Sequence, residues 1–251
     1  MFSSVMQRAR CWLAPDVTEG ESRLFSSFDR IASLQGEPIN ASRMSYLVRV
    51  PLDGKYYYVK VYHVAGRYLR RFLGRSRVAA EWQNQRYFEY LDVPTARVVA
   101  FAETNDRRGA IVTEEVAGSV DLWTLSQRSP QIFRDRTWCN AIILELANHT
   151  RSLHDAGFVH YDLKWRNILV TEVEPKVRII DCPLGRTFDK SVPLYHRGVV
   201  KDLACLDRVA RFFLSRSQRL RFFLHYRGHK RLTREDRRIL LRVLRFFQGR
   251  L

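Results

Sequence analysis

The sequence contains few of the features that mark secreted, zinc-binding or membrane-spanning proteins. Its four cysteines, Cys11, Cys139, Cys182 and Cys205, have no paired spacing, so neither a zinc motif nor a disulfide framework is expected. No apolar run approaches the ~20 residues needed to cross a bilayer. The N-terminal residues lack the apolar core of a signal peptide. We therefore expect a cytoplasmic protein, or one that binds a membrane peripherally from the cytoplasmic side.

Acidic residues are also few compared with basic residues. The 251 residues include 43 Lys and Arg but only 26 Asp and Glu, which gives a formal net charge of +17. Because 46% of the residues are hydrophobic, the chain can still bury a substantial core, which excludes a disordered tail. The positive charge predicts an anionic partner: nucleic acid, an acidic membrane surface or a phosphorylated molecule.

The element pattern predicts an α+β fold with two lobes, 1–116 and 117–251. The first lobe is expected to hold a small antiparallel sheet and one helix, because it is rich in β-branched and aromatic residues and has an Asp-Gly turn at 53–54. Its strands are expected at 46–50, 56–62, 97–103 and 109–115, with an earlier strand near 31–35, and its helix at 76–91. The second lobe is expected to be helical over 132–156 and 199–250, with short strands at 168–170 and 177–180.

One segment has the spacing of a kinase catalytic loop. His160 and Asp162 form a His-x-Asp pattern, and Asn167 follows five residues after the Asp. In such a loop the Asp reaches the hydroxyl that attacks the γ-phosphate of ATP, and the Asn holds Mg²⁺. The spacing predicts Asp162 as a catalytic residue, with Lys164 beside it, and Asn167 as a metal ligand.

Three further residues fit the same chemistry. Asp181 follows the apolar run 177–180, where a second oxygen ligand for Mg²⁺ belongs. Lys60 lies within an apolar strand, where a buried ammonium needs a partner, and Glu81 on the next helix can supply it. Each residue also has an ordinary interpretation: Lys60 and Glu81 as solvated residues, Asp181 as a turn cap, and His160 as a structural histidine. The order of all these residues along the chain favours a kinase.

Five stretches, 58–62, 79–82, 92–95, 111–115 and 153–167, resemble the lipopolysaccharide core kinases, the family of heptose kinases and 3-deoxy-manno-octulosonic acid kinases. The resemblance implies a bilobal protein-kinase-like fold that phosphorylates core sugars with ATP at the cytoplasmic face of a Gram-negative inner membrane. It implies that Lys60 and Glu81 position phosphate, that Glu114, Glu115 and Val116 form the hinge at adenine, and that Asp202 braces the catalytic loop.

The sequence departs from protein kinases at three places. The segment from Gly36 to Ser42 has a single glycine where a glycine-rich loop is expected, although its small residues could still let backbone N–H groups approach phosphate. Tyr161 replaces the arginine that reads a phosphorylated activation loop in many protein kinases. No Ala-Pro-Glu occurs between Asp181 and Asp202. Because Ala-Pro-Glu belongs to the platform that docks peptides, its absence favours a small or lipid-linked acceptor over a protein.

Most of the positive charge lies at the C-terminal end. Residues 197–251 contain 16 Lys and Arg against 4 Asp and Glu, and the arginines alternate with Leu and Phe. This pattern predicts amphipathic helices on an anionic membrane that carries the glycolipid acceptor. The alternative is that the apolar positions form ordinary core. Nucleic-acid binding is a further alternative, but no zinc knuckle, helix-turn-helix or aromatic RNA-binding motif is present.

Overall fold

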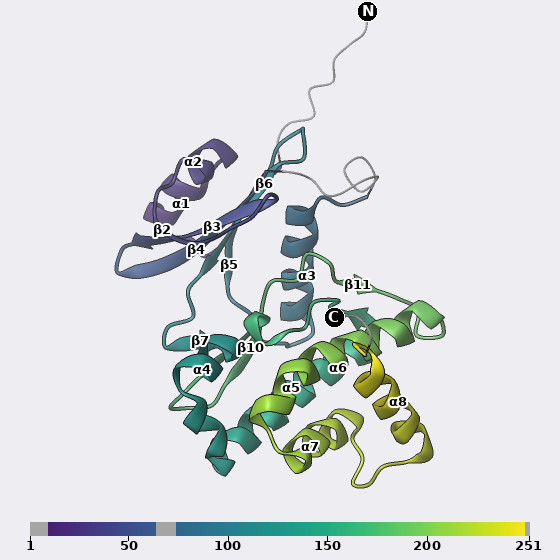
Figure 1. The fold of residues 1–251 in the computed structure, drawn as a ribbon. Coiled ribbons are helices and arrows are strands. Elements are labelled where there is room, and N and C mark those ends of the chain that lie inside the picture. The colour runs from purple at the N-terminus through teal and green to yellow at the C-terminus, as the bar shows by residue number, and fades with distance from the viewer. Residues whose placement is uncertain (1–9, 64–73, 249–251) are drawn as a thin grey trace, which may run out of the picture. The chain divides into compact units, whose positions relative to one another are not determined.

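The computed structural model describes residues 10–63 and 74–248 and divides the chain into two compact units (Figure 1). The first unit consists of two stretches, the residues up to Arg86 and Ala96–Val116. The second contains Tyr87–Thr95 and all residues from Ala117 onward, so the end of the expected first-lobe helix belongs to it. Residues before Arg10 and the last positions of the expected C-terminal helix lie outside the described residues. Within 10–63 and 74–248, no helix is long and apolar enough to cross a membrane.

The first unit contains a six-stranded antiparallel sheet with the order β1-β5-β6-β4-β3-β2. Asp53 and Gly54 join β3 to β4 with φ values of 50° and 76°, as the expected tight hairpin turn requires. The strands are β1 (Arg10–Leu13), β2 (Glu37–Ala41), β3 (Ser45–Leu52), β4 (Lys55–Tyr62), β5 (Val98–Glu103) and β6 (Gly109–Glu114).

The expected strand near 31–35 is wrong, because the chain forms two short helices before β2. These are α1 (Glu19–Phe25) and α2 (Phe28–Ala32). Thr18 caps α1 through a capping box with Glu21, and Ser27 caps α2. The first unit therefore holds two helices besides α3 (Arg77–Tyr90), the expected one.

Helices cover both faces of this sheet. Tyr57, Val59 and Val61 of β4 pack in one cluster with Phe25 and Ile31 of the two N-terminal helices. The side chains between them point to the opposite face, where Tyr62 packs with residues of α3. This alternation places Lys60 on the face that α3 covers.

The second unit is mainly helical. Its long helices are α4 (Leu122–Arg128), α5 (Arg136–Asp155), α6 (Pro193–Phe213), α7 (Arg216–Arg227) and α8 (Arg234–Arg245), with short 3₁₀ helices η2 (Pro130–Arg134) and η3 (Trp165–Asn167). Two small antiparallel sheets contain β7 (Ser119–Asp121), β9 (Ile168–Thr171) and β10 (Val177–Ile179), and β8 (Phe158–Val159) with β11 (Arg186–Thr187). The strands expected at 168–170 and 177–180 are thus present, and the described parts of 132–156 and 199–250 are mainly helical, as expected.

Candidate active site

The loop that carries Asp162 follows β8 and is held by one buried carboxylate. Asp202 of α6 has no exposed surface and accepts hydrogen bonds from the backbone N–H of His160 at 2.7 Å and of Tyr161 at 2.8 Å. Tyr161 has a φ of 67°, a left-handed conformation that is unfavourable for a bulky residue. Two hydrogen bonds to Asp202 therefore stabilise a strained backbone directly before Asp162.

Asp162 is ordered by its neighbours but stays accessible. Its Oδ2 accepts a hydrogen bond from Lys164 Nζ at 2.7 Å and a longer one from Asn167 Nδ2 at 3.3 Å. Its Oδ1 has no hydrogen-bond partner among the described residues. Because one third of the Asp162 side chain is exposed, this oxygen can meet a substrate hydroxyl.

His160 supports the loop as a neutral imidazole. Its Nδ1 accepts a hydrogen bond from the backbone N–H of Asp162 at 3.3 Å, so the ring proton belongs on Nε2. Burial lowers the pKa of His160, although the carboxylates of Asp202, Asp162 and Asp181 oppose that shift. The ring also stacks against Phe88, with 6.1 Å between ring centroids.

Asn167 and Asp181 are brought together by strand pairing. Ile168 of β9 lies opposite Ile179 of β10, and the N–H of Ile180 donates to the carbonyl of Asn167 at 3.0 Å. Asp181 comes next along the chain and has a φ of 58°. The two expected metal ligands therefore lie at the same end of two paired strands, with Asn167 directly before β9 and Asp181 shortly after β10.

The donor set suits Mg²⁺. The amide nitrogen of Asn167 donates to the main-chain carbonyl of Asp162 at 2.9 Å, which leaves its amide oxygen without a hydrogen-bond partner in the described chain. Among residues 10–63 and 74–248, no group of three or more His, Cys, Asp or Glu side chains could hold a metal. Two oxygen ligands from the protein fit Mg²⁺, which keeps water and phosphate oxygens in its shell.

In the first unit, Lys60 and Glu81 form the expected pair. Lys60 Nζ donates to Glu81 Oε1 at 3.2 Å and to Oε2 at 3.1 Å. The Glu81 side chain is only 4% exposed, and it also accepts a hydrogen bond from the hydroxyl of Tyr62. The interpretation of both residues as solvated surface residues is therefore wrong. The pair holds the ammonium group in a defined place on the α3 face of the sheet.

The expected hinge residues have side chains that are already paired. Glu115 binds Arg49, with a shortest distance of 2.6 Å, and Glu114 binds Lys55 at 2.8 Å and Arg97 at 3.0 Å. The N–H groups of Glu114 and Glu115 donate to other main-chain carbonyls. A contact of Glu115 with adenine would therefore use its carbonyl oxygen, and Val116 follows as the third expected hinge residue.

The structure separates Gly36 from Ser42. Ser42 lies at the turn between β2 and β3, where its hydroxyl accepts hydrogen bonds from the N–H groups of Met44 and Ser45, each at 3.2 Å. Gly36 lies at the other end of β2, and a Cβ there would collide with the carbonyl oxygen of Arg49. The close approach of the Arg49 carbonyl thus explains the glycine at position 36. Of the two residues, only Ser42 lies at the hairpin tip.

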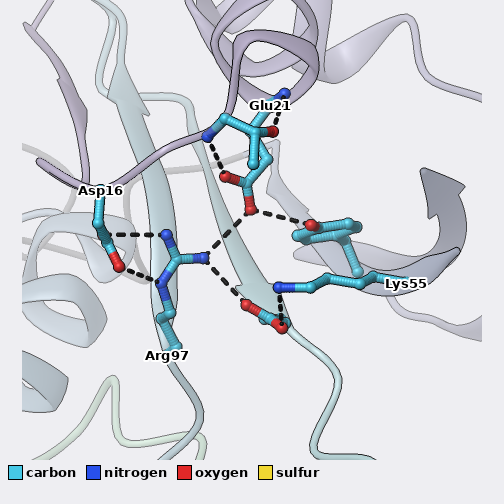
Figure 2. A network of polar contacts seen from close by, with 7 residues as sticks. Asp16, Glu21, Lys55 and Arg97 are labelled. Atoms are coloured by element: carbon cyan, nitrogen blue, oxygen red, sulfur yellow. Dashed lines mark hydrogen bonds and ion pairs between the residues drawn. The ribbon is translucent and has the colours of Figure 1, made fainter. Parts of the chain in front are cut away.

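The sequence did not reveal the network of ion pairs around Arg97 (Figure 2). Arg97 Nη1 binds Glu21 at 3.1 Å and Glu114 at 3.0 Å, and Nη2 binds Asp16 at 3.0 Å. Burial would raise the pKa of Glu21, but hydrogen bonds from Thr18, Tyr57 and Arg97 outweigh it and lower that pKa. The Thr18-x-x-Glu21 spacing of a capping box was the one signal of this network in the sequence.

The chain matches the model of the family described as the lipopolysaccharide kinase (Kdo/WaaP) family over residues 29–241. Among solved structures it is similar to WaaP in complex with acyl carrier protein, with 26% identity and a TM-score of 0.71 over 96% of this chain and 97% of that chain. It also shares the fold of the Cydia pomonella granulovirus kinase PK-1, with 18% identity and a TM-score of 0.51 over 71% and 67% of the two chains. No curated protein matches the sequence.

Proposed function

The chain belongs to the lipopolysaccharide kinase (Kdo/WaaP) family, and from this premise we propose that it phosphorylates a heptose or 3-deoxy-manno-octulosonic acid hydroxyl of the lipopolysaccharide inner core. It is an ATP-dependent kinase with a protein-kinase-like fold. The observation that carries the proposal is the ordered catalytic loop, in which Asp162 keeps one carboxylate oxygen accessible while Lys164 and Asn167 hold the other.

In the proposed reaction, Asp162 Oδ1 accepts the proton of the sugar hydroxyl as the sugar oxygen attacks the γ-phosphorus of ATP. The bond from that phosphorus to the bridging oxygen breaks, and ADP leaves. Lys164, which contacts Asp162 at 2.7 Å, is placed to offset negative charge as the phosphoryl group moves. Asp202 contributes through the backbone that it holds and does not touch the substrate.

We propose the following roles in nucleotide binding. Lys60, oriented by Glu81, is proposed to bind phosphate oxygens of ATP. Asn167 and Asp181 would hold Mg²⁺, which neutralises phosphate charge when it is bound. Glu114, Glu115 and Val116 are proposed as the adenine hinge, and Ser42 at the hairpin tip as a phosphate contact.

A glycolipid acceptor suits the short connection after the metal ligand. Only β11 lies between Asp181 and the start of α6 at Pro193, and no Ala-Pro-Glu occurs before Asp202. A peptide substrate needs a docking platform in this region, whereas a sugar hydroxyl does not. We therefore favour a lipopolysaccharide sugar over a protein as the acceptor.

We further propose that the protein works at the cytoplasmic face of the inner membrane of a Gram-negative cell, where its positive charge would bind anionic lipid.

WaaP was solved in complex with acyl carrier protein. We propose an acyl carrier protein as a partner of this chain too. Co-expression of the two proteins and mass spectrometry of the intact complex tests this proposal, and two separate species at micromolar concentrations would contradict it.

The experiment that tests the function is mass spectrometry of core oligosaccharide from cells that lack this protein. We expect loss of one phosphate from a heptose or 3-deoxy-manno-octulosonic acid residue, restored by the wild-type protein. Unchanged phosphate content would reject the proposed acceptor.

Two variants test the assignment of Asp162. Asp162→Asn should fail to restore the phosphate and should lower kcat by about 10²- to 10⁴-fold in vitro, because the amide cannot accept the hydroxyl proton. Asp155→Asn, the same change at an exposed residue at the end of α5, is the matched control and should restore it. Full activity of Asp162→Asn would contradict the assigned base.

A further inference from the structure

A groove of about 790 Å³ opens beside Asp162 within the second unit. Its lining comes from the catalytic loop, α4, η3, α6 and the residues after α8, and it consists largely of aromatic rings and cations. Asp162 is the only acidic residue in this lining. The aromatic members are Trp123, Trp165, Phe212, Phe213 and Phe247, and the cationic members are Lys164, Arg166, Lys201, Arg208 and Arg211.

Four of these cations lie over aromatic rings and have no carboxylate partner among the described residues. Lys201 Nζ is 5.3 Å from the ring centroid of Tyr161, and Arg208 Cζ is 5.0 Å from that of Phe247. Arg166 and Arg211 have similar ring contacts, at 5.2 Å and 4.7 Å. A ring contact holds a cation in place but leaves its N–H donors available.

Two arginines elsewhere in the same unit form ion pairs with acids. Arg219 binds Asp207 at 2.6 Å, and Arg227 binds the buried Asp236 at 2.7 Å. The four ring-bound cations of the groove therefore carry positive charge that no ion pair among the described residues balances. An anion is the ligand that such a site would take.

Helix α6 connects this charge to the catalytic loop. Lys201, Cys205, Arg208 and Phe212 recur at intervals of four, three and four residues, so they share one face of the helix, and all four line the groove. The neighbouring Asp202 turns inward to the loop. Lys201 and Arg208 are about 10 Å apart along the helix axis at 1.5 Å per residue, a span that suits an anionic group close to the reacting sugar.

We propose that this groove is the acceptor subsite and that Lys201 and Arg208 select acceptors carrying a carboxylate or phosphate near the hydroxyl that is phosphorylated. The inference rests on the proposed function and deepens it. The γ-phosphate of ATP repels an acceptor that is already anionic, so unpaired cations beside Asp162 offset that repulsion. The exposed ring of Phe212 and the indole of Trp123 provide apolar surfaces for the sugar C–H groups.

The test uses deacylated, water-soluble core oligosaccharide from cells that lack the protein, so that membrane binding does not contribute. Phosphotransfer is measured for the wild type, for the double variant Lys201→Gln/Arg208→Gln, and for Arg237→Gln. Arg237 is an exposed residue of α8 outside the groove lining and is the matched control. We expect the KM for oligosaccharide to rise about 10- to 100-fold in the double variant and to stay unchanged in Arg237→Gln.

Changing the ligand separates the two anion sources and leaves the protein intact. Methyl esterification removes carboxylate charge, and phosphatase treatment removes phosphate charge. A rise in the wild-type KM after one treatment, with no further rise in the double variant, supports the proposal and identifies that anion. Equal KM values for the wild type and the double variant, or no response to either treatment, would overturn it.

Calorimetric binding of the same oligosaccharide separates this inference from the proposed function. If the wild type transfers no phosphate but binds the oligosaccharide more tightly than the double variant, the anion site stands and the proposed function fails. If the wild type phosphorylates the oligosaccharide and the double variant does so with an unchanged KM, the function stands and the subsite is wrong.

Discussion

Asp202 shows how one buried residue can control an active site that it does not enter. Its two carboxylate oxygens accept from consecutive backbone N–H groups, those of His160 and Tyr161. Tyr161 would otherwise leave its left-handed conformation, since a bulky side chain disfavours it. The direction of the next side chain, Asp162, therefore depends on Asp202.

Asp202→Asn should lower both stability and kcat. An amide offers one acceptor oxygen, so one of the two N–H groups loses its partner, at a cost of about 1–3 kcal/mol. Urea unfolding and steady-state kinetics measure the two effects. Asp207→Asn, on the same helix but bound to Arg219, is the control and should leave kcat unchanged. Wild-type kcat in Asp202→Asn would show that the loop holds its conformation without this carboxylate.

The lowered pKa of His160 should make the protein less stable in mild acid. Burial lowers its pKa in the folded state. Below about pH 6.5 the unfolded chain takes up a proton that the folded protein does not, so the free energy of unfolding falls as the pH falls. The slope is at most about 1.4 kcal/mol per pH unit for one histidine, and it ends at the folded-state pKa.

Denaturant unfolding between pH 7.5 and about 5 checks this prediction. His160→Asn keeps an acceptor for the Asp162 N–H but does not titrate, so its profile should be flatter than that of the wild type. His149, whose pKa is also lowered by burial, contributes the same kind of slope and remains in both proteins. Parallel profiles for the two proteins would contradict the role of His160.

At the scale of elements, Arg97 links the N-terminal segment to the sheet through ion pairs. It precedes β5, yet it binds Asp16 and Glu21 from the N-terminal segment and Glu114 at the end of β6. Glu21 is buried, whereas Asp16 is exposed. The two ion pairs should therefore differ in their effect on stability.

Arg97→Met should destabilise the protein by about 3 kcal/mol, because the Glu21 carboxylate is left buried without its cation. Asp16→Asn should change the unfolding free energy only slightly, because that pair is solvent-exposed. Urea unfolding of both variants, with Arg97→Met/Glu21→Gln to measure the coupling, provides the comparison. Equal losses in the two single variants would show that burial of Glu21 does not decide the effect.

Elements with a clear hydrophobic period were predicted and are present, such as β4 and α5. The elements that were missed lack such a period. All five residues of β2 are exposed, so its sequence has no alternation to read. The strand predicted at 31–35 is wrong because the caps Thr18 and Ser27 begin the helices α1 and α2 in this part of the chain.

At the scale of the whole molecule, the basic C-terminal end forms partly core and partly surface. Phe223, Tyr226 and Val243 are buried together with residues of α6. These apolar positions therefore form ordinary core, as the alternative to membrane binding predicts. Leu241 and Leu244 of α8 are about half exposed, at 51% and 50%, among arginines. These exposed leucines are the side chains that the proposed contact with an anionic membrane would use.

The protein should bind vesicles containing an anionic phospholipid and should release them as salt increases, because the Debye length falls from about 10 Å at 0.1 M to about 3 Å at 1 M. Vesicle sedimentation measures the bound fraction. Leu241→Ser/Leu244→Ser should weaken binding, whereas Leu194→Ser, an exposed leucine on α6, should not. Equal binding to neutral and anionic vesicles would contradict the electrostatic part of this prediction.

The sequence was enough to predict the catalytic loop, because His160, Asp162 and Asn167 lie within one short segment. Asp181 was predictable too, because it follows β10, which pairs with the strand directly after Asn167. The sequence also indicated the Lys60–Glu81 pair, because strand and helix periods place these residues. The folding of the chain brings Arg97 to its partners, which lie 81, 76 and 17 positions away and share no local pattern with it. The tertiary structure likewise decided that the groove cations contact rings instead of carboxylates, because side chains from several helices meet there only after the chain has folded.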